Sequence, residues 1–198
     1  MLINVRGIKL KTNTIQRILE EEKPVMVALV ETKLRKMDEY KIPGYKIERV
    51  DRDEEGGGVL IAIKETLNET WITTTEYKKH DCEMLWVKFD EMKIKIKIGI
   101  VYMPQESRTK VKILEEIYST IETEIKDAAE GNYHLLLVGD LNCKIGNSMI
   151  KRNTSNITTG GRLLNKMLKR NRLIIGNAQE TCEGLWTRIE GQQKSVLD

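Results

Sequence analysis

Cysteine is scarce in this sequence, and its spacing argues against one common kind of metal site. The chain of 198 residues has three cysteines, Cys82, Cys143 and Cys182, which are widely separated. None of them forms the closely spaced pair that structural zinc sites use, so a zinc-stabilised fold is not expected. The odd number of cysteines and the lack of a secretory signal favour a reducing compartment inside the cell.

Long hydrophobic runs and linkers are also missing. The longest apolar stretches, such as Val25–Val30 and Leu135–Val138, are far too short to cross a bilayer. No internal repeat, low-complexity tract or Pro/Gly-rich linker is found, which predicts a single domain over residues 1–198. The 33 Lys and Arg against 30 Asp and Glu give a net charge of +3, which supports a nucleic-acid partner only weakly.

What the sequence does contain is a series of short strand-like segments mixed with helical ones. Strands are expected at Leu2–Val5, Val25–Val30, within Tyr40–Val50, Val59–Ile63, Thr70–Thr75, Met84–Phe89, Lys93–Val101, Leu135–Val138, Leu173–Gly176, Leu185–Arg188 and Ser195–Asp198. Helices are expected at Thr14–Glu22, Gly161–Asn171 and from a Ser107 cap to about Ala129. Since strands and helices do not alternate strictly, we expect an α/β fold of two mainly antiparallel sheets with helices outside.

Polar side chains stand at the points where several of these strands end. They are Asn4, Glu31, Tyr102, Gln105, Asp140 and Asn142. Loops at strand ends commonly build active sites. Carboxylates, amides and a phenol gathered at one edge suit a hard cation and a phosphate, because Mg²⁺ prefers oxygen ligands and needs only one or two protein carboxylates.

Each of these residues, taken singly, has a more ordinary interpretation. Glu31 could be a solvated loop residue, and Asn4 could end its strand in a turn. The segment from Gly139 to Asn142 could be an Asx turn, and Tyr102 could belong to an ordinary loop. The combination, in this order along the chain, is what favours a functional site.

Successive segments resemble the motifs of the endonuclease/exonuclease/phosphatase superfamily, in the same order. They are Ile3–Gly7, Val30–Leu34, Val101–Pro104, Val138–Asn142, and Trp186-Thr187 together with Ser195–Asp198. Gly56–Ala62 resembles the segment between the second and third motifs. Glu83–Val87 resembles the endonuclease domains of LINE-type non-LTR retrotransposons, as does the segment that ends at Asp198.

The resemblance implies a four-layer α/β sandwich and a phosphodiesterase that uses Mg²⁺, or Mn²⁺ in its place. It implies that Glu31 is the principal metal ligand and that Asn4 lies beside the metal and the phosphate. Tyr102 would donate a hydrogen bond to the scissile phosphate. Asp140 would orient or deprotonate the attacking water, and Asn142 would align the phosphate.

The resemblance also implies roles near the end of the chain and exposes departures from the pattern. Asp198 would hold a histidine that contacts the phosphate, with Thr187 and Ser195 in supporting positions. The family's final Ser-Asp-His motif is not found, because His80 and His134 do not match it. We therefore expect a domain that is incomplete at its C-terminus, lacking its last strands, with impaired catalysis.

A second departure concerns Gln105, where the family often has asparagine. Glutamine makes similar hydrogen bonds but reaches further, so its contact with the phosphate is open. Single cations such as Lys9, Lys11, Arg152 and Arg162 could contact backbone phosphates or could simply be solvated.

The leading expectation is a DNA-nicking endonuclease of a retroelement, whose nick leaves a 3′-hydroxyl that primes reverse transcription. Its partners would be DNA and a reverse-transcriptase domain of the parent polyprotein, with no membrane, and it would act in the nucleus if its target is genomic DNA. One alternative is an inactive remnant that binds nucleic acid weakly. Another is a different phosphodiesterase of the superfamily, acting in abasic-site repair, RNA deadenylation, or phosphoinositide or sphingomyelin hydrolysis.

Overall fold

The computed structural model describes residues 1–52, 56–67, 71–91, 93–146, 156–176, 179, 188–190 and 193–195. The chain forms two compact units. The first unit comprises Met1–Met103 and Ala128–Asp140, and the second comprises Pro104–Asp127 and Leu141–Asp198. Each unit is described by itself below, and whether the chain is one domain stays a prediction.

The first sheet of the first unit has four strands in the order β1-β2-β4-β3. They are β1 (Leu2–Asn4), β2 (Met26–Val30), β4 (Val59–Lys64) and β3 (Tyr45–Val50). The pair β1 and β2 is parallel, and the other two pairs are antiparallel.

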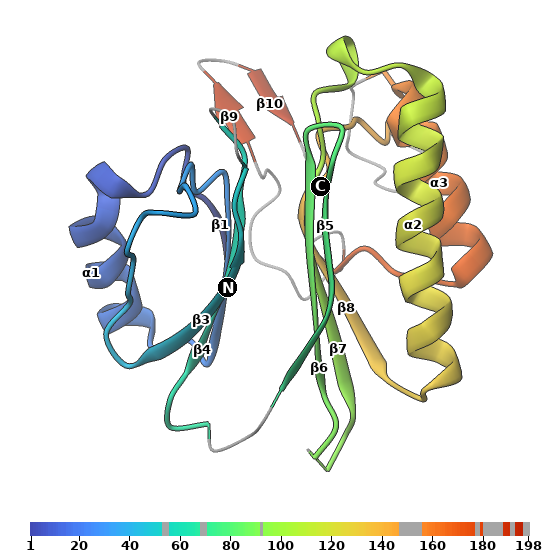
Figure 1. Ribbon diagram of the computed structural model, residues 1–198. Helices are drawn as coiled ribbons and strands as arrows, with labels where there is room; N and C mark the ends of the chain where they lie inside the picture. Colours follow the sequence, from blue (N-terminus) through green and yellow to red (C-terminus); the bar gives the residue numbers. More distant parts are fainter. Residues whose placement is uncertain are drawn as a thin grey trace. The chain divides into compact units, whose positions relative to one another are not determined.

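A helix covers one face of this first sheet. After a short 3-10 turn at Lys9–Lys11, α1 (Thr12–Glu22) buries Ile15 and Leu19. These two side chains join one hydrophobic cluster with Val27, Leu29, Leu60 and Ala62, which come from β2 and β4. The side-chain spacing of α1 at i and i+4 gives it this apolar face, which explains why it packs there. Figure 1 shows α1 beside the strands of this sheet.

The second sheet has the order β5-β6-β7-β8, formed by β5 (Ile72–Lys79), β6 (Cys82–Phe89), β7 (Ile96–Tyr102) and β8 (His134–Asp140). Only β7 and β8 are parallel. The two sheets pack face to face through a core that joins Ala28, Val30, Ile61 and Ile63 to Leu85, Val87, Ile98 and Ile100. Alternate residues of each strand point into this core, as the period of two requires.

The second unit is built around two helices. It holds a 3-10 turn at Glu106–Arg108, most of α2 (Val111–Glu130), α3 (Thr159–Asn171) and the short antiparallel pair β9 (Arg188–Glu190) and β10 (Gln193–Ser195). Arg170 of α3 donates hydrogen bonds from Nη1 to both carboxylate oxygens of Glu122 in α2, each at 3.0 Å. Thr158 caps α3 by accepting a hydrogen bond from the Gly161 N–H.

These elements confirm the predicted α/β fold of two mainly antiparallel sheets with helices, with one parallel pair in each sheet. Three details differ from the prediction. Ser107 lies in the 3-10 turn rather than capping α2, which begins at Val111. Leu173–Gly176 is not a strand, since Arg172 ends α3 with a left-handed conformation and Ile174 is exposed.

The third difference concerns β7, which the alternation of charged and apolar residues predicts to be half-buried. Its central residues are all buried, Lys97 included. The Lys97 ammonium lies 5.2 Å from the centre of the Trp86 ring. A buried lysine over an aromatic face is favourable, so this charge does not mark a solvent-facing position.

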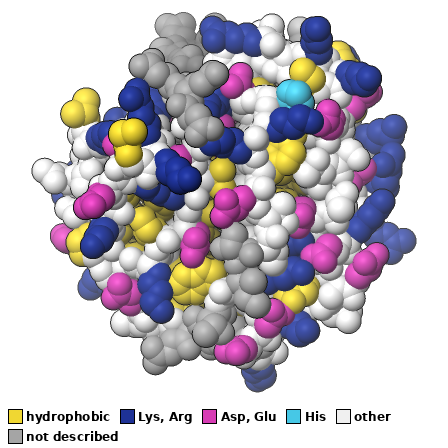
Figure 2. Space-filling view, in the orientation of Figure 1, with side chains coloured by type: hydrophobic (Ala, Val, Ile, Leu, Met, Phe, Trp, Pro, Cys, Tyr) yellow, Lys and Arg dark blue, Asp and Glu magenta, His cyan; other side chains and the backbone are white. Residues whose placement is uncertain are grey.

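No helix in the described residues is long and apolar enough to span a membrane. On the face shown in Figure 2, Lys and Arg side chains are interspersed with Asp and Glu side chains. Charge on that face is therefore mixed, as the small net charge of the sequence suggests.

Candidate active site

Strand pairing in the first unit aligns the ends of four strands that carry polar residues. In the first sheet Asn4 pairs with Val30, so Glu31 follows immediately beside Asn4. In the second sheet Tyr102 pairs with Asp140 at the ends of two parallel strands. Since parallel strands end at the same edge of a sheet, each pairing brings its two polar residues to one level.

Hydrogen bonds of Asn4 connect the two sheets at this edge. Its side-chain nitrogen donates to Glu31 Oε1 at 2.8 Å and to Asp140 Oδ2 at 2.9 Å. The Arg6 N–H donates to Asn4 Oδ1 at 3.1 Å, which fixes the direction of the amide. Tyr102 pairs with Asp140 on the neighbouring strand, and the charges of Glu31 and Asp140 act on its phenol. Four of the predicted residues, Asn4, Glu31, Tyr102 and Asp140, therefore meet in one place.

The backbone around Glu31 is held in an uncommon conformation. Glu31 has a φ of +55°, a value that non-glycine residues adopt rarely. Its carbonyl accepts a hydrogen bond from the Gly7 N–H at 2.7 Å, and the next residue, Thr32, donates its N–H to the Gly58 carbonyl at 3.2 Å. These neighbours fix the turn that directs Glu31 toward Asn4, and strain of this kind is concentrated at functional sites.

Gly139, which precedes Asp140, is required by its surroundings. Its φ is +148°, and a Cβ atom there would lie 1.8 Å from the Val101 carbonyl oxygen. No side chain fits at that distance, so the close approach of β8 to β7 depends on glycine. The residue thus controls where the backbone delivers Asp140.

The electrostatics of the site favour a neutral phenol beside two carboxylates. Burial raises the pKa of Tyr102 well above its ordinary value, and the negative charges of Glu31 and Asp140 raise it further. The positive charge of Arg52 opposes this shift without cancelling it. Tyr102 consequently keeps its proton at neutral pH and can donate a hydrogen bond to an anionic oxygen.

The oxygen donors at this edge fit a hard divalent cation. Both the Glu31 and Asp140 carboxylates accept from the same amide nitrogen, so their charges lie close together and a cation between them would be strongly favoured. Mg²⁺ needs only one or two carboxylates and keeps several waters. Among the described residues no group of three or more His, Cys, Asp and Glu side chains is placed to hold a metal.

The remaining predicted residues lie elsewhere in the chain. Gln105 and Asn142 belong to the second unit, where the Gln105 carbonyl accepts from Thr109 Oγ1 at 2.9 Å. Asn142 has a φ of +46°. Thr187 and Asp198 lie outside the described residues, and Ser195 is described only as part of β10. Their roles stay predictions.

Two residues at this edge were not among the predicted site residues. Arg52 Nε donates to Glu83 Oε1 at 2.6 Å, and the guanidinium carbon lies 5.9 Å from the centre of the Tyr102 ring. Burial alone would lower the pKa of Arg52, but the hydrogen bond and charge of Glu83 outweigh it and the pKa is raised. The run Gly56–Gly58 was the sequence signal for tight packing here, because a Cβ at Gly57 would lie 2.5 Å from Arg52 Nε.

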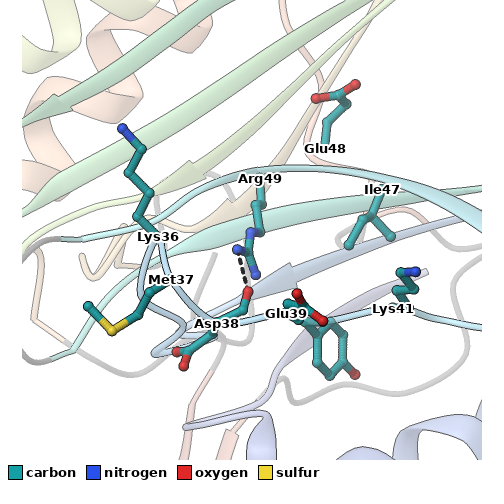
Figure 3. Close-up of a pocket in the computed structure, with 9 residues that line it drawn as sticks. Lys36, Met37, Asp38, Glu39, Lys41, Ile47, Glu48 and Arg49 are labelled. Atoms are coloured by element: carbon teal, nitrogen blue, oxygen red, sulfur yellow. Dashed lines mark hydrogen bonds between the residues drawn. The ribbon is translucent and has the colours of Figure 1, made fainter.

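A hollow of about 640 Å³ lies apart from these residues. Figure 3 shows that it is bounded by residues 36–41 and by Ile47, Glu48 and Arg49 of β3. Arg49 donates to the Asp38 carbonyl at 2.7 Å, which is the dashed line of Figure 3. Asp38 also pairs with Lys9 at 2.6 Å, and the hydrogen bond from Lys9 is the largest cause that lowers the Asp38 pKa. Charges of opposite sign therefore pair at the edge of this hollow.

No family model matches the chain, and no curated protein matches it. Solved structures do match. A 3′ phosphatase NExo from Neisseria, bound to a product DNA hairpin, is 14% identical with a TM-score of 0.63, over 85% of this chain and 69% of that one. An AP endonuclease from Archaeoglobus fulgidus is 18% identical with a TM-score of 0.59, over 85% and 69%.

A third match is the AP endonuclease LMAP from Leishmania major. It is 16% identical with a TM-score of 0.62, over 86% of this chain and 65% of that one. Identities this low bear on the fold and not on the activity. The chain has the two-sheet α/β sandwich of these three solved structures.

Proposed function

We propose that this chain is a divalent-metal-dependent phosphodiesterase that nicks DNA. The observation that carries the proposal is the meeting of Glu31, Asp140 and Asn4 through the two hydrogen bonds of the Asn4 amide. A neutral phenol, Tyr102, stands beside them. The sandwich fold is shared with enzymes whose names describe action on DNA, which supports the substrate class.

Glu31 would be the principal metal ligand and Asn4 would lie beside the metal, with Mg²⁺ as the expected ion and Mn²⁺ as a substitute; the nearby negative charge of Asp140 would add to the attraction for the cation. A bound divalent cation supplies Lewis-acid stabilisation of the charge that develops on the phosphate oxygens. Asn4 keeps both carboxylates turned to the same point, because its one amide group donates to each of them. Its oxygen accepts a hydrogen bond from the Arg6 N–H, which fixes the direction of the amide.

The protein side chains would then act on water and phosphate. Asp140 orients an attacking water and accepts its proton, while Tyr102 donates a hydrogen bond to a non-bridging phosphate oxygen. Asn142 would align the phosphate and Gln105 would contact it. Asp198 would hold a histidine that contacts the phosphate, and Thr187 and Ser195 would have supporting roles. These assignments follow the resemblance in motif order.

A retroelement origin is the more specific part of the proposal. It is supported by the resemblance of Glu83–Val87 to the endonuclease domains of LINE-type elements. An enzyme of this kind nicks one strand of duplex DNA and leaves a 3′-hydroxyl, with a reverse-transcriptase domain in the same polyprotein. It would cut duplex DNA without an abasic site, unlike an enzyme confined to abasic-site repair.

The test is nicking of supercoiled plasmid by the purified chain in Mg²⁺ or Mn²⁺. We expect relaxed circles, no product in EDTA, and loss of about a thousandfold in rate for Asp140→Asn. Asp38→Asn is the matched control, since Asp38 is an aspartate of the same unit that pairs with Lys9 away from the site. Equal rates for wild type and Asp140→Asn would refute the proposal.

A second pair of substrates separates nicking from repair. A duplex oligonucleotide is compared with the same duplex carrying one abasic site, under single-turnover conditions. The proposal expects cutting of both at similar rates. Cutting confined to the abasic strand would leave the phosphodiesterase assignment standing and replace the retroelement assignment by repair.

A further inference from the structure

A buried ion pair lies directly beside the candidate site and plays no part in the proposed chemistry. The Arg52 guanidinium donates to both carboxylate oxygens of Glu83, at 2.6 and 3.1 Å. It also donates to the Asp81 carbonyl at 2.7 Å. The Glu83 side chain is 1% exposed and that of Arg52 is 15% exposed, so the fork-like contact is almost fully shielded from water.

One side of this pair is connected to Tyr102. Glu83 is the residue opposite Tyr102 in the antiparallel pairing of β6 and β7. The Arg52 guanidinium carbon lies 5.9 Å from the centre of the Tyr102 ring. The ring is therefore flanked by a cation that is itself fixed, and a fixed cation over a phenol ring limits how the ring can turn.

The other side of the pair is connected to the turn that carries Glu31. Gly57 leaves no room for a side chain, because a Cβ there would lie 2.5 Å from Arg52 Nε. The Gly58 N–H donates to Glu83 Oε2 at 3.1 Å. The carbonyls of Gly57 and Gly58 in turn accept from the N–H groups of Lys33 and Thr32.

Close packing between Thr32 and Gly58 further restricts the turn that carries Glu31. Thr32 is fully buried, and a Cβ at Gly58 would lie 2.4 Å from its Oγ1. The position of the residue after Glu31 is thus set by the glycine run, and the glycine run is set by the Arg52–Glu83 pair. A displacement of the Arg52–Glu83 ion pair would therefore displace both the turn that carries Glu31 and the Tyr102 ring.

We infer that Arg52 is a positioning residue: through its ion pair with Glu83 it holds Tyr102 and the Glu31 turn in the arrangement that the proposed phosphodiesterase uses. The inference rests on the proposed function for its catalytic consequence, while the positioning itself is a property of the fold. Arginine is needed rather than lysine, because only its planar fork satisfies both oxygens of Glu83 and the Asp81 carbonyl together.

The consequence for catalysis is a change in kcat more than in KM. Misplacing a hydrogen-bond donor by a fraction of an ångström weakens its contact in the transition state, and we expect Arg52→Gln to lower kcat at least about tenfold. Arg52→Lys keeps the positive charge but loses the planar guanidinium that binds both Glu83 oxygens, so its kcat should be close to that of Arg52→Gln. In a Tyr102→Phe background, Arg52→Gln should lower kcat by a much smaller factor than it does alone, because part of its effect comes from the changed position of Tyr102.

The positioning is tested without any activity by NMR of the tyrosine rings. The chain is labelled with ¹³C-tyrosine, and the Tyr102 signal is identified by its disappearance in Tyr102→Phe. Arg52→Gln and Arg52→Lys should shift or broaden that signal, because the cation over the ring is lost or displaced. Arg49→Gln is the matched control, an arginine three positions earlier that pairs with Asp51 at 3.2 Å.

The outcomes separate this inference from the proposed function. An unchanged Tyr102 signal in both Arg52 variants overturns the inference, whether or not the chain nicks DNA. Equal shifts in the Arg52 variants and in Arg49→Gln, with equal drops in melting temperature, also overturn it, since they show general loosening of the fold. A Tyr102 signal that shifts in both Arg52 variants of a chain that neither binds Mn²⁺ nor nicks DNA supports the positioning and refutes the proposed function.

Discussion

Two polar regions of the first unit invite comparison: the edge formed by Asn4, Glu31, Tyr102 and Asp140, and the hollow beside residues 36–41. The hollow has a large open volume, about 640 Å³, and one carboxylate at its edge, Asp38, already has a cation partner in Lys9. At the edge of the sheets two carboxylates accept from a single amide. Two carboxylates that share one donor present a cation with two negative charges at one point, so the arrangement of the donors favours this edge over the larger hollow as the site.

The largest expected difference between the two regions is in metal binding. Glu31→Gln and Asp140→Asn should each weaken Mn²⁺ binding by at least the roughly 10–100-fold that loss of a supporting group costs at metal sites. Glu48→Gln, at the hollow, should leave Mn²⁺ affinity unchanged. Calorimetric titration of Mn²⁺ measures all three, and equal affinities across them would break the comparison.

The next difference is in the stability lost when a glycine is replaced by alanine at Gly139, beside the site, and at Gly44, just before β3. Gly139→Ala places a methyl group against the Val101 carbonyl, at 1.8 Å, and should lower the free energy of unfolding by about 3 kcal/mol or more, or prevent folding. Gly44, just before β3, also has a positive φ, but a Cβ added there would meet no atom within 4 Å. Gly44→Ala should therefore cost only the backbone strain, about 1 kcal/mol.

Urea unfolding of the two alanine variants measures this contrast. A similar loss in both would show that the approach of β8 to β7 adjusts more easily than the distances imply.

A smaller effect is expected at the hollow itself. Arg49→Gln removes the contact with Asp51 at 3.2 Å and the hydrogen bond to the Asp38 carbonyl at 2.7 Å. These partly exposed contacts should stabilise the fold by about 1 kcal/mol, and their loss should not alter Mn²⁺ binding. A melting curve and a Mn²⁺ titration of the same variant provide the measurement, and weakened Mn²⁺ binding would connect the hollow to the site.

The last prediction, the loss of folding stability that ionisation of Tyr102 causes, has no effect at neutral pH and is seen only at alkaline pH. Its pKa in the folded chain is raised, so above the ordinary tyrosine pKa of about 10 the unfolded chain ionises first. The stability that neutral Tyr102 contributes is fully present below about pH 10 and is lost as the pH rises beyond it. Wild type should therefore lose stability relative to Tyr102→Phe between about pH 10 and 11, measured by urea unfolding in EDTA, whereas parallel curves would contradict the burial of the phenol.

Much of the fold could be predicted from local patterns. The stripe of Ile15 and Leu19 predicted α1, and the apolar run before Glu31 predicted β2. The fate of Lys97 could not be predicted, because an alternating charge looks solvent-facing until both faces of its strand are covered. The start of α2 was predicted a few residues too early, because Ser107 belongs to a 3-10 turn that precedes the helix instead of capping it.

The candidate site shows the same division. The polar residues at strand ends were found from the sequence because each follows an apolar run and matches a motif in order. Arg52 and Glu83 were not found as a pair, because nothing local joins residues 31 positions apart. Motif resemblance supplied roles for Gln105, Asn142, Thr187, Ser195 and Asp198, and those roles await tests.

The sequence by itself determined which chemical groups follow the apolar strands, which face of α1 is apolar and which positions must be glycine to permit a turn. Only the tertiary structure decided that the Asn4 amide joins carboxylates from different sheets, one of them 136 residues away. Local periodicity encodes which face of a helix is apolar, as in α1, because that face depends only on neighbours in the chain. Pairing register and sheet packing depend on contacts between distant segments, and these alone bring Asn4, Glu31 and Asp140 to one point.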